Sequence, residues 1–412
     1  MEKKYLNHRI LLAGILIFTA VISGCAKNNN LRLYKDNEEV RVALGHKVGK
    51  ITVTSPSGMK LTTQNGSMTL QKSDTIFIEF DNSEFKMYLN RDKRIIVKSL
   101  PIYFTPLNAG LFSFNGMIYR GSLMLKKDAD ELLLPINRLS IEDYLKGVVP
   151  AEIGKLDKKK IEASKAQAVA ARTYAFAHLN RHSDMGYDLE CTVQDQVYRG
   201  YLLEDSITNR AIDETRGIVA LYKNVPIDAK YHSTCGGYTS DNENEWVGSP
   251  APYLRGGFDG EGCFFKRVYC SKSKHYKWAY EYNKKDFYDM VSKNYSSLKK
   301  VSVEAVSVYV SKKDKYKRVI ELTIKDKSGK KYSVKGLDIR KLFTFEEHLG
   351  GMLKSRYFEI KEDGGKIVVN GGGFGHGVGM CQYGAMEMAA SGKNYKQILT
   401  HYYKGIQLKR VY

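Results

Sequence analysis

Short runs of alternating hydrophobic and polar residues, separated by turn-forming residues, characterise the chain from Val40 to about Leu139. Alternation of this kind turns one face of a strand toward a core and the other toward solvent. These residues therefore predict a strand-rich N-terminal part. The strand-like runs span 40–44, 51–53, 75–80 and 94–97, and turn residues gather at 55–58 and 64–66.

The clearest helical pattern covers Lys158–His182, which is rich in alanine. Ile161, Ala168 and Ala175 recur at heptad spacing, so a helix would carry them on one narrow apolar stripe. Small alanine side chains would let another element approach this helix closely. Glu152 lies just ahead of it in the sequence.

The remainder of the chain mixes strand-like and helical patterns. Strand-like residues return at 218–231, and a glycine-rich loop at 371–379 precedes two predicted helices, 382–391 and 394–403. We therefore predict an α+β fold. It has a strand-rich N-terminal part, a central Ala-rich helix with Glu152 at its start, and a C-terminal Gly-rich loop followed by two helices.

The N-terminus has the features of an export signal. Basic residues precede the apolar run 10–22, which is too short to span a bilayer comfortably but suits the hydrophobic part of a secretory signal. The run leads into Ser23-Gly24-Cys25, and small residues before a cysteine resemble the bacterial lipobox, whose cysteine is acylated. We predict a lipoprotein signal peptide at 1–25 with lipidation at Cys25, and a tether at 26–39. An uncleaved anchor or a plain signal peptide is the alternative. The protein would then be an exported, membrane-anchored lipoprotein facing the cell wall or periplasm.

The charge points to an anionic partner. The 412 residues carry a net charge of +20, and with 43% apolar and 27% charged residues the chain is not disordered. Nucleic acid, a membrane surface or an acidic wall polymer would each match this charge. Export disfavours nucleic acid, and we expect none. Residues 261–340 alone hold 21 lysines and arginines against 9 acidic residues, which marks a basic unit.

Five cysteines remain after Cys25. In an oxidising compartment an odd number allows at most two disulfides and leaves one thiol. Cys235, Cys263 and Cys270 are the favoured participants, but the sequence does not determine the pairing. No CxxC or HExxH spacing occurs, so a zinc ribbon or a zincin site has no support. The five are Cys191, Cys235, Cys263, Cys270 and Cys381.

Two polar residues in unusual surroundings are candidates for chemistry. The apolar neighbours of Glu152 would raise the pKa of its carboxyl group by penalising the ionised form, as a general acid near neutral pH requires. Its alternative role is that of a helix N-terminal acid that complements the helix dipole. His376 lies in the loop 371–379, whose glycines fit no phosphate-binding register and indicate close approach to a ligand or a packed strand. A structural role is the alternative for His376.

Five ordered segments of the chain together resemble the SpoIID/LytB family, the stage II sporulation protein D group of bacterial cell-wall proteins. The resemblance implies a family domain with a first part at 40–260, a basic insertion at 261–345 and a C-terminal part at 346–412. The matching segments are 141–152, ending in Pro150-Ala151-Glu152, then 165–175, 196–200, 231–239 and 373–385.

The resemblance implies a lytic transglycosylase that acts on peptidoglycan glycan strands, with Glu152 as the catalytic acid and base. Other matching residues would line the glycan cleft: tyrosines by stacking on sugars or half-buried in the core, Arg172 by holding a lactyl carboxylate or forming a local ion pair, and amide and imidazole groups by orienting acetamido groups. These substrate-binding candidates are Gln167, Arg172, Tyr174, Tyr198, His232, Ser233, Tyr238, His376, Gln382 and Tyr383.

Two further expectations come from the family. Some sporulation members carry zinc on a Cys, an upstream His and a His-Cys pair before Gln-Val-Tyr, but here the pair is replaced by Gln194-Asp195, with Cys191 and His182 left. We therefore expect no metal or other cofactor. Relatives regarded as amidase enhancers leave a non-catalytic enhancer of a cell-wall amidase as an alternative to the enzyme. The basic insertion leaves another, a wall-binding module that docks on anionic polymer through that insertion.

Overall fold

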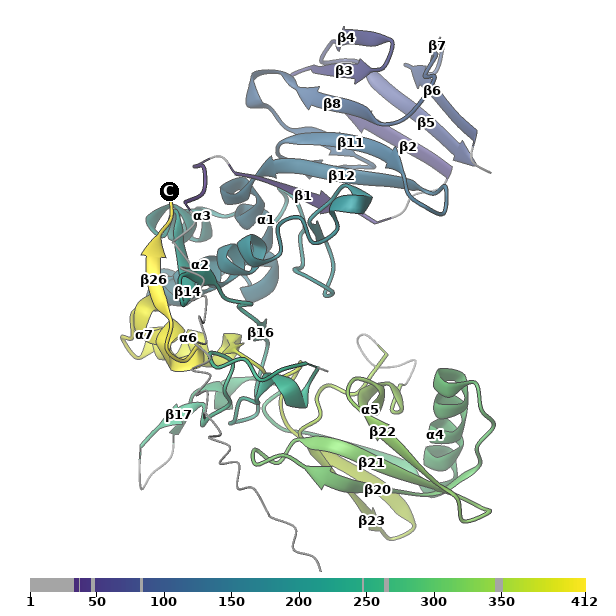
Figure 1. The fold of residues 1–412 in the computed structure, drawn as a ribbon, viewed down its shortest axis with the longest axis vertical. Helices are drawn as coiled ribbons and strands as arrows, with labels where there is room; N and C mark the ends of the chain where they lie inside the picture. Colours follow the sequence, from purple (N-terminus) through teal and green to yellow (C-terminus); the bar gives the residue numbers. More distant parts are fainter. Residues whose placement is uncertain are drawn as a thin grey trace, which may run out of the picture.

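The computed structural model describes residues 33–36, 38–45, 49–81, 84–246, 248–262, 267–344 and 351–412. The predicted signal peptide with Cys25, most of the tether, and Cys263 lie outside these residues. Within them, no helix is both long and apolar enough to cross a membrane. The mixture of strand-rich sheets, central helices and short C-terminal helices confirms the predicted α+β class (Figure 1).

The N-terminal part contains two antiparallel sheets, one of which takes up a short parallel strand at its edge. The larger sheet has the strands β13 (Leu189–Glu190), β1 (Glu39–Ala43), β12 (Leu133–Ser140), β11 (Ser122–Lys127), β8 (Ile102–Pro106), β3 (Met59–Thr63) and β4 (Gly66–Leu70), in that order. The smaller sheet has β10 (Met117–Tyr119), β9 (Phe112–Phe114), β2 (Gly49–Thr54), β5 (Thr75–Asp81), β6 (Glu84–Leu89) and β7 (Lys93–Ile95). Every predicted strand of this region is present.

A helical layer follows the sheets (Figure 1). Buried residues of the sheets and helices form one continuous core, so these elements are one folding unit. The helices are α1 (Ile141–Ile153), α2 (Ile161–Ala177), α3 (Ser206–Glu214), α6 (Gln382–Ala390) and α7 (Tyr395–Tyr402), accompanied by the sheet of β15 (Val225–Pro226), β14 (Ile218–Tyr222) and β26 (Gln407–Arg410).

The Ala-rich helix α2 differs from its prediction in two respects. It ends at Ala177, short of His182, and it is buried on nearly every side where a narrow stripe was expected. The reason is its central place, in contact with α1, α3, α6, α7 and β14. A helix enclosed on all sides needs small or apolar residues around its whole circumference, which its alanines provide.

A second lobe occupies the lower right of Figure 1 and has a hydrophobic core of its own, drawn from residues 278–369. The boundaries of the basic insertion, 261–345, stay a prediction. The lobe contains β19 (Trp278–Asn283), β24 (Lys366–Gly371) and β23 (Phe358–Asp363) in one sheet, β20 (Ala305–Lys313), β21 (Val319–Asp326) and β22 (Lys331–Lys335) in another, and the helices α4 (Lys284–Lys299) and α5 (Asp338–Lys341).

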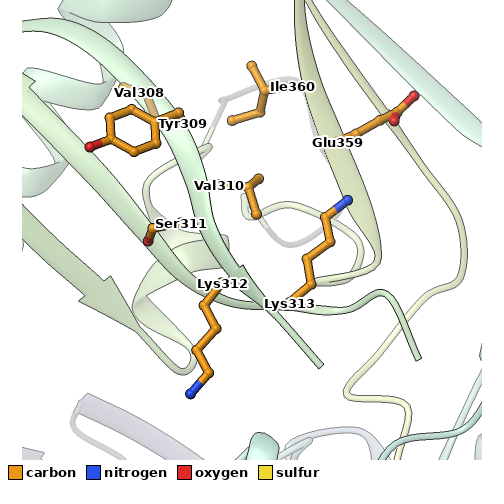
Figure 2. A pocket seen from close by; sticks show the side chains of 8 residues that line it. All are labelled: Val308, Tyr309, Val310, Ser311, Lys312, Lys313, Glu359 and Ile360. Atoms are coloured by element: carbon orange, nitrogen blue, oxygen red, sulfur yellow. The ribbon is translucent and has the colours of Figure 1, made fainter. Parts of the chain in front are cut away.

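A shallow depression of about 410 Å³ lies on this lobe between β20 and β23. In Figure 2 the side chain of Lys313 extends toward that of Glu359, and the side chain of Lys312 points away from both. The depression contains none of the predicted site residues. The lining residues are Val308, Tyr309, Val310, Ser311, Lys312, Lys313, Glu359 and Ile360.

Short elements connect the helical layer with the second lobe. The strands β16 (Tyr231–His232) and β25 (Met380–Cys381) pair in parallel, although they are far apart in sequence. The remaining short elements of the described residues lie at several places along the chain. They are the strands β17 (Gly260–Glu261) and β18 (Arg267–Val268) and the 3-10 helices η1 (Leu107–Ala109), η2 (Lys158–Lys160), η3 (Ser183–Met185), η4 (Asn242–Asn244) and η5 (Tyr269–Lys272).

Candidate functional site

Glu152 lies in the last turn of helix α1. The helix begins at the N-cap Ser140, whose side chain accepts a hydrogen bond from the Asp143 amide, and it ends at Gly154, where φ is +80°. Glu152 therefore precedes the Ala-rich helix, as expected, but belongs to a separate helix. Glu152 therefore cannot be an acid that complements the N-terminal end of a helix dipole. It lies at the C-terminal end of α1, where the dipole disfavours a negative charge.

Two groups from distant segments donate to the Glu152 carboxyl group, and a third residue contacts one of them. The backbone N–H of Val197 donates to Oε1 at 2.7 Å, and Nε2 of Gln382 in α6 donates to Oε2 at 3.4 Å. The same Gln382 nitrogen lies 3.5 Å from Oε1 of Gln167 in α2. The structure thus brings together three of the predicted residues, Glu152, Gln167 and Gln382.

The surroundings of Glu152 change its proton affinity. Burial raises the pKa of its carboxyl group from the ordinary 4.5, because the ionised form loses hydration. Hydrogen bonds from the Val197 amide, the Gln382 amide group and the Tyr231 side chain act in the opposite direction, as does the charge of Arg199. The net direction is upward, so the carboxyl stays protonated at a pH where an exposed glutamate has ionised.

A buried hydrogen-bond chain extends from Glu152 through residues that were not among the candidates. Nε2 of Gln196 donates to the Tyr231 hydroxyl at 2.9 Å, and the Tyr144 hydroxyl donates to Oε1 of Gln196 at 3.2 Å. All three lie in the segments that carry the family resemblance. The signal for them was their position in those segments, since uncharged side chains give no chemical hint of their own.

The parallel strand pair β16–β25 holds two of the residues that contact Glu152. Tyr231 is opposite Met380 and His232 opposite Cys381, so Tyr231 and Gln382 leave the pair near each other, on the same side as Glu152. The loop and helix that follow are also joined, because the Tyr383 amide donates to the Ser233 carbonyl at 3.1 Å. Ser233 and Tyr383, both predicted to bind substrate, are half-buried at this junction.

His376 is fixed as a neutral imidazole by two backbone hydrogen bonds. Its Nε2 lies 2.9 Å from the Tyr231 carbonyl, and its Nδ1 accepts from the Val378 amide at 3.1 Å. This pattern requires the proton on Nε2, and burial holds the pKa well below its usual range. His376 therefore positions Tyr231, and the structural alternative describes it better than a free acid or base.

An exposed tryptophan packs beside this histidine. The Trp246 ring lies 5.0 Å from the His376 ring, and Nζ of Lys230 lies 5.5 Å from the same indole. The Trp246 side chain remains 40% exposed. An aromatic surface of this kind stacks on the apolar faces of sugars. Trp246 was not among the predicted substrate-binding residues.

His232 is fully enclosed next to the same loop. Its Nδ1 lies 3.1 Å from the Val378 carbonyl, and its ring lies 5.3 Å from that of His376. Burial lowers the pKa of His232 to about 3. This residue is a packing group beneath the site, not one that faces solvent.

Two other candidates lie in the interior, away from the Glu152 carboxyl. Arg172 is fully buried and donates to both carboxylate oxygens of Glu142 at 2.8 Å, which is the local ion pair that the sequence left open as its alternative role. Tyr198 donates to Oδ1 of Asn137 at 2.8 Å and packs on Gly147, where a Cβ would lie 2.5 Å from the tyrosine ring. Both are core residues: Arg172 lies on the enclosed helix α2, and Tyr198 packs between α1 and β12.

The two remaining tyrosine candidates are Tyr174 and Tyr238. Tyr174 is buried, stacks on His178 at 4.0 Å and donates to Oδ1 of Asp195 at 2.7 Å. Tyr238 is half-buried against Phe258, with ring centroids 5.4 Å apart. Tyr174 is therefore held in the interior by His178 and Asp195, whereas Tyr238 keeps part of its surface accessible.

At the position where the family resemblance implied a zinc-binding pair in some members, this chain forms hydrogen bonds. Asp195 accepts from Tyr174, from Arg181 at 2.9 Å and from the Glu190 amide at 2.8 Å. These contacts occupy the carboxylate. The expectation that no metal binds near Cys191 stays a prediction.

A different group of residues has the chemistry of a metal centre. Three thiols and a carboxylate, all buried, have their ligand atoms within 4.8 Å of one another. We call this group the thiol cluster, and it consists of Cys235, Asp259, Cys270 and Cys381.

The fold and site define a class of α+β protein in which a half-buried glutamate with a raised pKa is held by a backbone amide and a glutamine. The family model described as stage II sporulation protein (SpoIID) matches residues 129–222, which include Glu152, and a domain of unknown function (DUF8618) matches residues 265–379. The chain belongs to the SpoIID family of cell-wall remodelling proteins.

Several proteins are similar to this chain over most of its length. An uncharacterised protein of Brachyspira hyodysenteriae is 36% identical over 72% of this chain and 74% of its own length. Stage II sporulation protein D of Bacillus subtilis is 32% identical over 66% of this chain and 75% of its own length. The amidase enhancer of Bacillus subtilis is 32% identical over 64% of this chain, but the match covers 40% of that protein.

Proposed function

We propose that this protein is a lytic transglycosylase that cleaves the bond between N-acetylmuramic acid and N-acetylglucosamine in peptidoglycan glycan strands. The observation that carries the proposal is the single Glu152 carboxyl, whose pKa is raised by burial. The other groups that act most strongly on it are a backbone amide, a glutamine, a tyrosine and an arginine. Hydrolytic glycosidases use two carboxyl groups, whereas transglycosylation with internal ring closure needs one.

The reaction uses Glu152 twice. Oε1 accepts the short hydrogen bond from the Val197 amide and Oε2 only the longer one from Gln382, so Oε2 carries the proton and transfers it to the glycosidic oxygen as the bond to the muramic C1 breaks. The C6 hydroxyl oxygen of the same sugar then bonds to C1, and its proton passes to the Glu152 carboxylate. The products are a strand with a 1,6-anhydro end and a strand with a free N-acetylglucosamine 4-hydroxyl. No water is consumed, and Glu152 regains its starting protonation state.

The hydrogen bonds around Glu152 suit both halves of this cycle. Burial favours the neutral acid before cleavage, and the Val197 and Gln382 donors stabilise the carboxylate that follows. The Trp246 surface supports the sugar, and the basic second lobe supplies attraction to an anionic wall. We propose the same wall-facing, membrane-anchored location that residues 1–25 predict.

Analysis of the reaction products tests the proposal. The protein is incubated with purified glycan strands, and the released fragments are analysed by mass spectrometry. Fragments with 1,6-anhydro ends are lighter by one water than hydrolysed ends, so the two chemistries are distinguished directly. Hydrolysed ends, or no fragments from either intact or peptide-free strands, would contradict the assignment.

A second candidate function comes from the relative named amidase enhancer. In that case the protein would release no fragments itself but would accelerate an added cell-wall amidase. The same incubation with and without amidase separates the two functions. Stimulation without anhydro ends would favour the enhancer.

The pH dependence of cleavage follows from the raised pKa of Glu152. The acid form is required, so kcat/KM is expected to fall as pH rises through that pKa, above the ordinary 4.5. Gln382 donates to the ionised carboxylate, so Gln382→Leu should move this alkaline limb upward by about half a pH unit to one pH unit. The exposed Gln194→Leu serves as the control. A limb that moved downward in Gln382→Leu would contradict this role.

Trp246→Ala is expected to raise KM for glycan strands by about 2- to 10-fold with a smaller change in kcat, since a stacked aromatic contributes about 0.5–1.5 kcal/mol. Trp246→Phe should retain most of the affinity. Tyr309→Ala is the matched control, because Tyr309 is also 40% exposed but lies on the second lobe. Initial rates over a range of strand concentrations measure both constants, and an equal effect of the two alanine variants would contradict stacking at Trp246.

A further inference from the structure

The thiol cluster has the dimensions of a metal site. Sγ of Cys235 lies 3.5 Å from Sγ of Cys270 and 3.0 Å from Oδ2 of Asp259, and all four ligand atoms lie within 4.8 Å. Zinc bonds of about 2.3 Å to sulfur and about 2.1 Å to oxygen place tetrahedral ligand atoms roughly 3.5–3.8 Å apart. The observed separations bracket these values. We propose that Cys235, Asp259, Cys270 and Cys381 bind one zinc ion.

The charge of the cluster also calls for a cation. Asp259 is completely buried, and among the described residues the basic side chain within 4.0 Å of its carboxylate is that of His401, at 3.9 Å, which is charged only when protonated. A buried carboxylate without a close cation is costly, and a divalent ion supplies the missing charge. Three thiolates with one carboxylate in a closed, buried arrangement favour zinc over magnesium or calcium, which take oxygen ligands.

Residues outside the cluster hold the ligands in the orientation that a metal needs. The Tyr402 hydroxyl donates to Oδ1 of Asp259 at 2.7 Å and leaves Oδ2 directed at Cys235. The Gly237 amide donates to the Cys235 sulfur at 3.2 Å, and the Cys235 amide to the Cys381 sulfur at 3.3 Å. Such hydrogen bonds to thiolates and ligating carboxylates are typical of the layer around a metal.

A glycine in α6 makes room for the carboxylate. A Cβ on Gly384 would lie 2.6 Å from Oδ1 and 2.8 Å from Oδ2 of Asp259. The helix backbone therefore approaches the ligand as closely as a residue without a side chain allows. This close approach encloses the cluster on the side of α6.

The ligands come from segments that meet beside Glu152. Cys381 ends β25 and directly precedes Gln382, Cys235 follows β16, and Cys270 lies in η5. Zinc with four protein ligands has no open position for substrate, so its role is structural. It would fix the β16–β25 pair, and with it the Tyr231 and Gln382 contacts to Glu152, to the chain that leads into the second lobe.

Metal analysis of the full-length protein tests the site. Protein purified without chelator is expected to hold close to one zinc per chain by inductively coupled plasma mass spectrometry. Cys270→Ser should lower the zinc content at least about tenfold, and Tyr402→Phe should weaken zinc retention against a competing chelator by about 10- to 100-fold. Cys191→Ser, outside the cluster, is the control and should keep its zinc.

Cobalt keeps the test valid if Cys270→Ser fails to fold. Wild-type protein refolded with Co²⁺ should show the strong thiolate charge-transfer and tetrahedral d–d absorption bands, and zinc should displace them. Mass spectrometry of the unreduced protein tests whether the cluster cysteines form a disulfide instead of binding zinc. A disulfide between any two cluster cysteines, or zinc that is absent from wild type or unchanged in Cys270→Ser, would overturn the proposal.

Discussion

Glu152→Gln is expected to abolish the release of 1,6-anhydro fragments while the protein stays folded. The amide cannot give up a proton to the glycosidic oxygen or take one from the C6 hydroxyl, and loss of a general acid–base group lowers a rate by about 10²–10⁴-fold. Glutamine has the same shape, and its oxygen can still accept from the Val197 amide. Mass spectrometry of the products measures the loss.

The matched control for this variant is Glu162→Gln. Glu162 is another half-buried glutamate whose carboxylate accepts from a backbone amide, that of Tyr395, at 2.8 Å, but it pairs with Lys165 and lies outside the Glu152 contacts. Its replacement should leave the products unchanged. Continued anhydro release by Glu152→Gln, or an equal loss in Glu162→Gln, would refute the role of Glu152.

Stability distinguishes lost chemistry from lost structure. The pKa of Glu152 is higher in the folded than in the unfolded protein, so its contribution is fully present below the ordinary 4.5 and is lost as pH rises through the raised value. Above that pH the folded protein holds an unfavourable buried charge, which glutamine removes. The midpoint of thermal unfolding of Glu152→Gln at neutral pH should therefore equal or exceed that of wild type.

Arg172→Met is expected to destabilise the fold by about 3–5 kcal/mol, because it leaves Glu142 as a buried charge without its partner. Burial alone would raise the pKa of Glu142, but the hydrogen bonds and charge of Arg172 lower it overall. Stability from this group is present above the ordinary 4.5 and is lost as pH falls through the lowered pKa. Urea unfolding monitored by circular dichroism measures the effect.

One control variant and one double variant test whether the lost stability comes from the buried Glu142 charge. Arg138→Met breaks a more exposed pair with Glu39, at 2.9 Å, and should cost less than about 1 kcal/mol. The double variant Arg172→Met with Glu142→Gln removes the stranded charge and should recover part of the loss. If Arg172→Met instead raised KM for glycan at unchanged stability, Arg172 would contact substrate after all.

Local sequence signals predicted much of the fold because they act over a few residues. The alternating runs around Ile51 and Ile76 became β2 and β5, and Asn394 and the residues after it became α7 through a capping box. The width of the buried surface on α2 was not predictable in this way. It depends on how many other elements surround the helix, and those elements come from both ends of the chain.

For Glu152, the neighbouring residues in sequence predicted the direction of its pKa shift but not its hydrogen-bond partners. Its apolar neighbours on α1 indicated a raised pKa, but the hydrogen bonds that moderate the pKa come from Val197 and from Gln382, the latter 230 residues away in sequence. The roles of Arg172 and His376 were left open for the same reason. Their partners, Glu142 and the Tyr231 carbonyl, are identified by contact and not by spacing.

Composition, periodicity and capping are properties of neighbouring residues, and they were enough to predict the α+β class, the basic unit at 261–340 and the candidate acid Glu152. Which polar groups are buried, which are paired, and the meeting of Cys235, Asp259, Cys270 and Cys381 at one point emerged from the folded chain. Desolvation, ion pairing and metal coordination depend on distances through space of a few ångströms, and spacing along the chain does not specify these distances.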